Sequence, residues 1–484
     1  MSKYIDLSLE EIHELLKNKK VTVETLVLEC FERIEKNDLN AFITLDKEGA
    51  LEKARLLDTM EVPDDLFFGI PIAIKDNIMV NGLRCTCASK MLDNFVSIYD
   101  AGVIDLVKKH NMVIIGKTNM DEFAMGSTSE TSFYGAPVNP WNKEKVSGGS
   151  SGGSAVAVAG RLVPFSLGSD TGGSIRQPAS FNGIVGMKPS YGRISRYGLV
   201  AFASSLDQIG PMTRNVKENA QILNILCQKD NRDLTSVDTN EDFTRKIGLP
   251  LDNFKVAIPK YFISDVVNPE IKEKVLEIKK LLEKNNIKVS MVDINHIDKA
   301  VILYQIIAMG EASSNLARFD GVRYGYSYPN PKNLEELYLK TRENGFGKEV
   351  KRRIMVGSYI LSGENANIYY NKAMQIRDDL QKNFKKVFSE YDLIIGPTTA
   401  RCAYDLNTGS DDPLRGFMDD ILVMHANMGG FPSLSLPIGF NKENLPIGLQ
   451  IIGNNFDEAT IYQLASFIEN ELNLDLGGAN VDGL

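Results

Sequence analysis

Two loops rich in glycine and serine lie close together in the stretch from Val146 to Gln177, and they constrain the fold more than any other part of the chain. The first loop covers residues 146–154 and the second covers residues 168–174. Between them, a run of small residues followed by an apolar run predicts one short helix and one short strand. Because each loop leads into a predicted helix start, both loops can meet at one point of the fold.

The composition of the two loops favours a nucleophile beside a site for negative charge. Glycines let the backbone turn sharply and leave its N–H groups accessible. Hydroxyls at Ser150, Ser151 and Ser174 lie among these donors. A flexible linker is the alternative interpretation, but the core-like runs at 156–158 and 163–165 disfavour it.

A serine nucleophile needs a base, and the candidate is Lys75. Residues 149–153 match the nucleophile elbow of α/β-hydrolases, but the residues before them, 140–145, predict a polar loop where the elbow requires a strand. Lys75 instead ends an apolar, strand-like run at 70–74. Desolvation there would lower the pKa of Lys75 and let it act as a neutral base.

The spacing of these residues resembles that of the amidase signature family, whose members use a Ser–Ser–Lys triad. Ser150 and Ser174 are 24 residues apart, and Lys75 precedes Ser150 by 75 residues, as in that family. The resemblance extends from Asp6 to about Phe467. It implies that Ser174 is the nucleophile and that Ser150 relays the proton of Ser174 to Lys75.

Further expectations concern the loops around the triad. The family places its relay serine after a cis peptide bond, which here would join Gly149 and Ser150. On chemistry alone Ser151 competes with Ser150, and only the family's spacing selects Ser150. When Ser174 attacks an amide, the oxyanion should fall against the backbone N–H groups just before it. These donors belong to Thr171, Gly172, Gly173 and Ser174 itself.

The resemblance also implies a binding site for glutamine. Family positions that hold glutamine map onto Tyr304, Arg353 and Asp420. A guanidinium can hold the α-carboxylate of a free amino acid, and a carboxylate can hold its α-ammonium. Arg352 competes with Arg353 for the first role, and Asp419 competes with Asp420 for the second.

Four longer motifs resemble the glutaminase subunits of bacterial tRNA-dependent amidotransferases; they cover residues 116–130, 139–141, 311–320 and 345–355. The resemblance implies hydrolysis of glutamine to glutamate and ammonia, with the ammonia converting Glu-tRNA(Gln) or Asp-tRNA(Asn) to the amidated form. It implies a heterotrimer in which the two partners are a tRNA-binding kinase/transamidase and a small third subunit. We expect ATP and Mg²⁺ at the kinase/transamidase, and no cofactor or metal in this chain. The alternatives are a stand-alone amidase that hydrolyses small amides and a non-catalytic scaffold.

Charge and composition agree with a partner that holds the tRNA. The 54 Lys and Arg against 63 Asp and Glu give a net charge of −9, which lacks the basic surface expected of a chain that grips nucleic acid by itself. Five scattered cysteines are expected to be reduced thiols in a cytoplasmic protein. No run of 18 apolar residues predicts a membrane span.

The order of predicted elements favours one α/β domain over residues 1–484. The resemblance implies a large mixed β-sheet enclosed by α-helices. We expect an N-terminal helical segment at about 6–60 and a mobile tail at about 475–484. His425 is expected to be a structural histidine. Besides 70–74, strands are predicted at 41–45, 112–115, 255–258, 287–294, 393–395 and 447–452.

Overall fold

The structure is a computed structural model that describes residues 4–238, 241–408, 418–474 and 476. Within these residues a mixed sheet of eleven strands has the order β1-β3-β2-β6-β8-β7-β12-β13-β11-β9-β10. Its strands are β1 (Phe42–Leu45), β2 (Pro71–Lys75), β3 (Val113–Thr118), β6 (Phe165–Asp170), β7 (Val185–Lys188), β8 (Gln208–Thr213), β9 (Lys255–Pro259), β10 (Lys288–Val292), β11 (Leu393–Pro397), β12 (Ser433–Phe440) and β13 (Pro446–Gly453). A separate hairpin joins β4 (Val138–Asn139) and β5 (Asn142–Val146).

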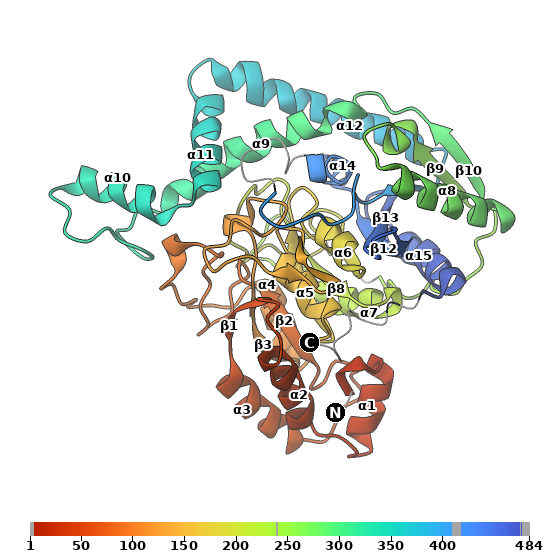
Figure 1. The fold of residues 1–484 in the computed structure, drawn as a ribbon, viewed down its shortest axis with the longest axis horizontal. Coiled ribbons are helices and arrows are strands. Elements are labelled where there is room, and N and C mark those ends of the chain that lie inside the picture. The colour runs from red at the N-terminus through yellow and green to blue at the C-terminus, as the bar shows by residue number, and fades with distance from the viewer. Residues whose placement is uncertain (1–3, 239–240, 409–417, 475, 477–484) are drawn as a thin grey trace.

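Helices flank this sheet (Figure 1). Helices α5 and α6 pack on each other; α5 contacts β2 and β6, and α6 contacts β12 and β13. Helices α7 and α15 form a second pair beside β8 and β12. The helices are α1 (Leu9–Lys17), α2 (Val23–Glu35), α3 (Lys47–Asp58), α4 (Gly102–Lys109), α5 (Gly152–Ala159), α6 (Arg176–Asn182), α7 (Val216–Leu226), α8 (Pro269–Lys284), α9 (Ala300–Asn315), α10 (Leu334–Gly345), α11 (Lys348–Leu361), α12 (Lys372–Phe388), α14 (Met424–Gly429) and α15 (Glu458–Leu472).

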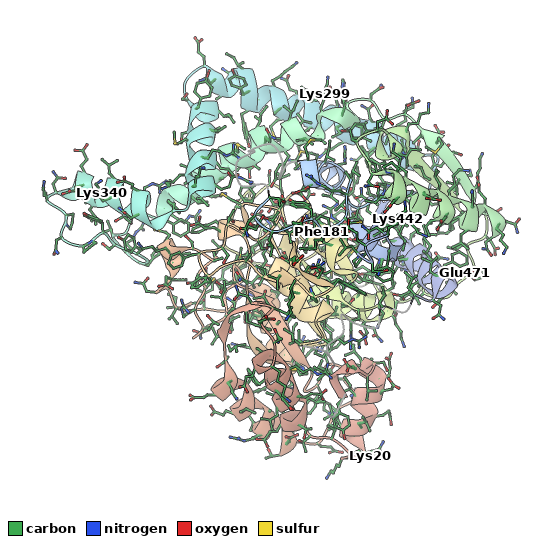
Figure 2. All side chains as sticks on the ribbon, viewed as in Figure 1. Lys20, Phe181, Lys299, Lys340, Lys442 and Glu471 are labelled. Carbon is green, nitrogen blue, oxygen red and sulfur yellow. The ribbon has the colours of Figure 1, made fainter. Side chains whose placement is uncertain are left out.

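The region around 300–388 is mostly helical, as the sequence predicts. Helix α9 packs against α11 and α12, and α14 packs against both α9 and α12. Helix α10 projects from the body of the molecule at the left of Figure 1. Lys340 on α10 and Phe181 on α6, both labelled in Figure 2, mark this outer tip and the buried centre.

The N-terminal segment is not purely helical. Residues 6–60 contain α1, α2 and α3, but they also contribute β1, which pairs antiparallel with β3 and so belongs to the main sheet. At the other end, the tail expected at 475–484 lies outside the described residues except for residue 476. Among the helices that the structure describes, none is long and apolar enough to cross a membrane.

Strand β2 positions the site because it is buried along its whole length. Such a continuous apolar run is typical of a central parallel strand. It pairs in parallel with β3 on one side and with β6 on the other. Since β2 ends at Lys75 and β6 ends at Asp170, Lys75 and the second glycine-serine loop emerge at the same edge of the sheet.

Candidate active site

Lys75 lies at the centre of a cluster of serine hydroxyls. Its side chain is fully buried. The Nζ atom is 2.7 Å from Ser150 Oγ, 2.8 Å from Ser151 Oγ, 3.0 Å from Ser169 Oγ and 3.2 Å from the Ser169 carbonyl oxygen. Asn77 Nδ2 also donates to Ser169 Oγ, at 2.9 Å. The structure therefore brings the predicted base and the predicted relay serine into direct contact.

The environment of Lys75 suits a neutral base. Burial lowers the pKa of Lys75 to about 7, and the carboxylates of Asp121, Asp170 and Asp207 only partly oppose this shift. A large fraction of the amine is therefore unprotonated at neutral pH. In that state its lone pair can accept a proton from a neighbouring hydroxyl.

The hydrogen bonds around Lys75 distinguish Ser150 from Ser151. The Ser151 hydroxyl donates to the Ser169 carbonyl oxygen at 3.0 Å and accepts from the Ser169 N–H at 3.2 Å, so its proton is already engaged. For Ser150 Oγ, the only hydrogen-bond partner within the described part of the chain is Lys75. The peptide bond between Gly149 and Ser150 is cis, as the resemblance implies. Ser150 is thus the serine whose proton remains free to move.

We expect Ser150→Ala to lower kcat for amide hydrolysis by roughly 10²- to 10⁴-fold, because a proton transfer step loses its carrier. Ser151→Ala is the matched comparison, since both hydroxyls contact Lys75 Nζ. It should cost about 1–3 kcal/mol of folding stability by stripping buried partners, with a much smaller loss of kcat. Steady-state kinetics and thermal unfolding of both variants check this. A larger kcat loss for Ser151→Ala would assign the relay to Ser151.

Ser174 lies on a loop that Asp170 holds in shape. The buried Asp170 carboxylate accepts from the backbone N–H groups of Gly173 and Ile175, at 2.8 and 3.2 Å. Arg176 binds both Asp170 oxygens in a fully buried ion pair. These bonds replace the helix start predicted at Ser174, and α6 begins at Arg176.

The two glycine-serine loops meet, as predicted. The Ser151 N–H donates to the Ser174 carbonyl oxygen at 3.1 Å. The Ser174 side chain is almost buried, and no described residue forms a hydrogen bond with its hydroxyl. The structure therefore joins Ser150 to Lys75 but shows no hydrogen bond from Ser174 to Ser150.

One of the expected oxyanion donors is already occupied. The Gly173 N–H points to Asp170, so it is not free to hold an oxyanion in this structure. The N–H groups of Thr171, Gly172 and Ser174 have no protein acceptor within the described residues. The sequence could not exclude Gly173, because the exclusion depends on where the Asp170 side chain turns.

Tyr304 and Asp420 border the Ser174 loop, although they lie far away in the sequence. A Cβ atom at Gly172 would be 2.5 Å from Tyr304 Cε2, so only glycine allows this close approach. A Cβ atom at Gly173 would be 3.1 Å from Asp420 Oδ1. Tyr304 and Asp420 are both 6% exposed. The loop and two of the three expected substrate-binding residues are thus adjacent.

Asp420 carries an unpaired polar atom. Its Oδ2 accepts from the Ser127 hydroxyl at 2.5 Å, whereas its Oδ1 is buried and has no hydrogen-bond partner among the described residues. Burial raises the pKa of Asp420 well above its usual range. The competitor Asp419 is bound by Arg401 and by the Tyr404 hydroxyl, which explains why it does not face the loop.

Arg353, on α11, is also 6% exposed. Its Nε donates to Glu349 Oε1 at 2.7 Å, and its guanidinium lies 5.6 Å from the centre of the Phe202 ring. The competitor Arg352 binds both oxygens of the same Glu349 and is largely on the surface. Phe202 stands edge-on to Tyr304, with ring centres 6.5 Å apart. Arg353 and Tyr304 therefore share one aromatic neighbour.

His425 lies away from this cluster. It is buried, and its ring nitrogens contact the carbonyl oxygens of Leu422 and Ile297. Burial lowers the pKa of His425 to about 4, so it is a neutral structural histidine, as expected. No group of three or more His, Cys, Asp or Glu side chains in the described residues could hold a metal ion.

A model of the amidase family matches residues 25–462, and the chain belongs to that family. Among its relatives, the A-type subunits of the glutamyl-tRNA(Gln) amidotransferases of Pediococcus pentosaceus and Oceanobacillus iheyensis are each 50% identical to it, over 96% and 95% of this chain and 97% and 95% of theirs. The crystal structure of the A-type subunit of glutamyl-tRNA(Gln) amidotransferase from Thermotoga maritima has a TM-score of 0.81 at 40% identity and covers 96% of this chain and 95% of its own. A crystal structure of an amidase matches with a TM-score of 0.82 at 26% identity, over 96% of this chain and all of its own.

Proposed function

We propose that this chain is the glutaminase subunit of a tRNA-dependent amidotransferase. It would hydrolyse glutamine and supply ammonia for converting Glu-tRNA(Gln) to Gln-tRNA(Gln), or Asp-tRNA(Asn) to Asn-tRNA(Asn), in the cytoplasm. The observation that carries the proposal is the 50% identity to the A-type subunit of a glutamyl-tRNA(Gln) amidotransferase over 96% of the chain. The 2.7 Å contact between buried Lys75 and Ser150 supports the hydrolytic step.

The proposed reaction begins at Lys75 in its neutral form. Lys75 accepts the Ser150 proton while Ser150 accepts the Ser174 proton, and Ser174 Oγ attacks the amide carbon of glutamine. The oxyanion binds the free N–H groups of Thr171 and Gly172, together with that of Ser174. Ser150 then gives a proton to the leaving ammonia, and water hydrolyses the glutamyl ester on Ser174 by the same route.

Asp420 and Arg353 would select a free amino acid. The unpaired Oδ1 of Asp420 is the kind of buried acceptor that an α-ammonium satisfies, and a bound ammonium would favour the ionised carboxylate. Arg353 would hold the α-carboxylate, and Tyr304 would close the pocket against Gly172. A simple amide lacks both charged groups and so could not use this clamp.

We expect Arg353→Gln to raise KM for glutamine by about 10- to 100-fold, because a charge-assisted contact is lost. Hydrolysis of propionamide, which has no α-carboxylate, should be unaffected by the same change. Arg352→Gln is the control: Arg352 binds the same Glu349, but it is more exposed, so its loss should change KM by less than about twofold. Equal effects of Arg353→Gln on both substrates would instead favour a stand-alone amidase.

The partner side of the proposal is a heterotrimer. The net charge of −9 fits a chain that leaves the tRNA to a tRNA-binding kinase/transamidase, while a small third subunit would complete the assembly. The kinase/transamidase would use ATP and Mg²⁺ to activate the aminoacyl-tRNA. The hydrolytic step proposed for this chain needs neither.

Ammonia release from glutamine tests the proposal directly. The chain should be measured alone and then with both expected partners, charged tRNA and ATP. We expect strong release only in the complete mixture, because the activity would be coupled to the acceptor tRNA. Full, tRNA-independent release from the lone chain would overturn the proposal in favour of the stand-alone amidase.

A further inference from the structure

A buried carboxylate outside the triad, Asp207, touches both halves of the proposed site. It immediately precedes β8 and is 3% exposed. Its Oδ1 accepts from the Thr171 hydroxyl at 2.6 Å. Its Oδ2 accepts from the backbone N–H groups of Phe202 and Ala203, at 3.0 Å each. Every hydrogen bond that this carboxylate forms with described residues thus goes to the Ser174 loop or to the segment that carries Phe202.

The contact with Thr171 bears on the oxyanion. A hydrogen bond to an ionised carboxylate is stronger than one between neutral groups, so it fixes the Thr171 side chain firmly. Thr171 and the following Gly172 have free N–H groups in the loop that leads to Ser174. Such donors act only when they are held at the position that the oxyanion takes. A restraint on Thr171 is therefore a restraint on the donors.

The contact with Phe202 bears on the substrate. The Phe202 ring lies 5.6 Å from the Arg353 guanidinium and edge-on to Tyr304. Since Asp207 holds the Phe202 backbone, it also fixes where this ring stands between the two side chains. One carboxylate thereby links the oxyanion donors to the wall that would receive the amino-acid end of glutamine.

We propose that Asp207 is a positioning residue of the amide hydrolysis, which holds Thr171 for the oxyanion and Phe202 for substrate recognition. The inference rests on the proposed function, because it assumes that Thr171 and Arg353 meet the substrate. Asp207 itself touches no reacting atom. Its effect on the reaction passes through Thr171 and Phe202.

Three substitutions test the two contacts separately in the assembled complex, with glutamine as substrate. Thr171→Val keeps the side-chain shape but removes the hydroxyl, so kcat should fall by roughly tenfold to hundredfold with little change in KM. Thr171→Ser keeps the hydroxyl and should restore most of kcat. Asp207→Asn weakens both contacts, so it should lower kcat and also raise KM for glutamine.

Two controls separate this role from a merely structural one. Asp242→Asn removes a carboxylate that also accepts from a threonine hydroxyl and a backbone N–H, at 2.7 and 2.9 Å, but whose partners lie outside the site. It should keep wild-type kcat and KM. Rates are normalised to folded enzyme by thermal unfolding, and Thr171→Val remains informative if Asp207→Asn fails to fold.

Wild-type kcat in Thr171→Val, or an equal loss in Thr171→Ser, would overturn the inference. Ser174→Ala in the same assay keeps its failure distinct from that of the proposed function. If Ser174→Ala is inactive while Thr171→Val matches the wild type, the role of Asp207 alone is wrong. If Ser174→Ala is as active as the wild type, the proposed function itself is wrong.

Discussion

Replacing Ser174 with alanine should reduce ammonia release from glutamine by roughly 10⁵-fold or more, the scale seen when a serine nucleophile is removed from a triad. No other group in the proposed mechanism can form the glutamyl ester, so Lys75 and Ser150 have no proton to transfer. The variant should fold normally, because no described residue forms a hydrogen bond with the Ser174 hydroxyl. The measurement is ammonia release by the full assembly, with thermal unfolding alongside.

Ser180→Ala is a matched control for that experiment. Ser180 lies on α6, six residues after Ser174, and is also buried, with only a 3.4 Å contact to Thr399 Oγ1 among the described residues. We expect Ser180→Ala to retain wild-type turnover. Mass spectrometry of the enzyme after mixing with glutamine under acid quench should detect the ester on the wild type and not on Ser174→Ala. Ester formation on another residue in Ser174→Ala would identify a different nucleophile.

The family and the fold class could be predicted from the sequence because short-range features carry them. Lys75 ends a continuous apolar run, and the Gly-Ser spacing belongs to two segments within thirty residues of one another. The mixed sheet flanked by helices confirms the predicted fold class, and the match over 25–462 confirms the family. The capping box at Ser8 and the start of α2 after Thr22 are also confirmed.

Contacts between distant segments explain what the sequence did not predict. Strands β7, β8 and β12 are missed: β7 is short, and β8 and β12 contain Pro211 and Pro437, which weaken a strand pattern. Their places depend on pairing with β6 and β13. In the same way, Asp207 meets Thr171 across 36 residues and Ser127 meets Asp420 across 293, so no local pattern reveals either contact.

The second large effect concerns Lys75, and its reason is electrostatic. For the wild type, kcat/KM should rise with pH through about 7, because protonated Lys75 cannot accept the Ser150 proton and burial sets its pKa there. Lys75→Arg retains a cation that stays protonated at every accessible pH. We therefore expect about 10³-fold or greater loss at all pH values, with no rising limb, because general-base catalysis is lost.

Lys117→Arg separates the loss of a base from the loss of a buried cation. Lys117 lies on the adjacent strand β3, is fully buried like Lys75, and is paired with Asp76 at 3.2 Å. Because its charge is used and its proton is not, the arginine variant should keep the wild-type pH profile. If Lys75 served only as a cation that holds Ser150 and Ser151, Lys75→Arg would preserve much of the activity and its dependence on pH. Loss of activity in Lys75→Arg together with an unchanged profile in Lys117→Arg would show that the reaction requires a lysine able to give up its proton.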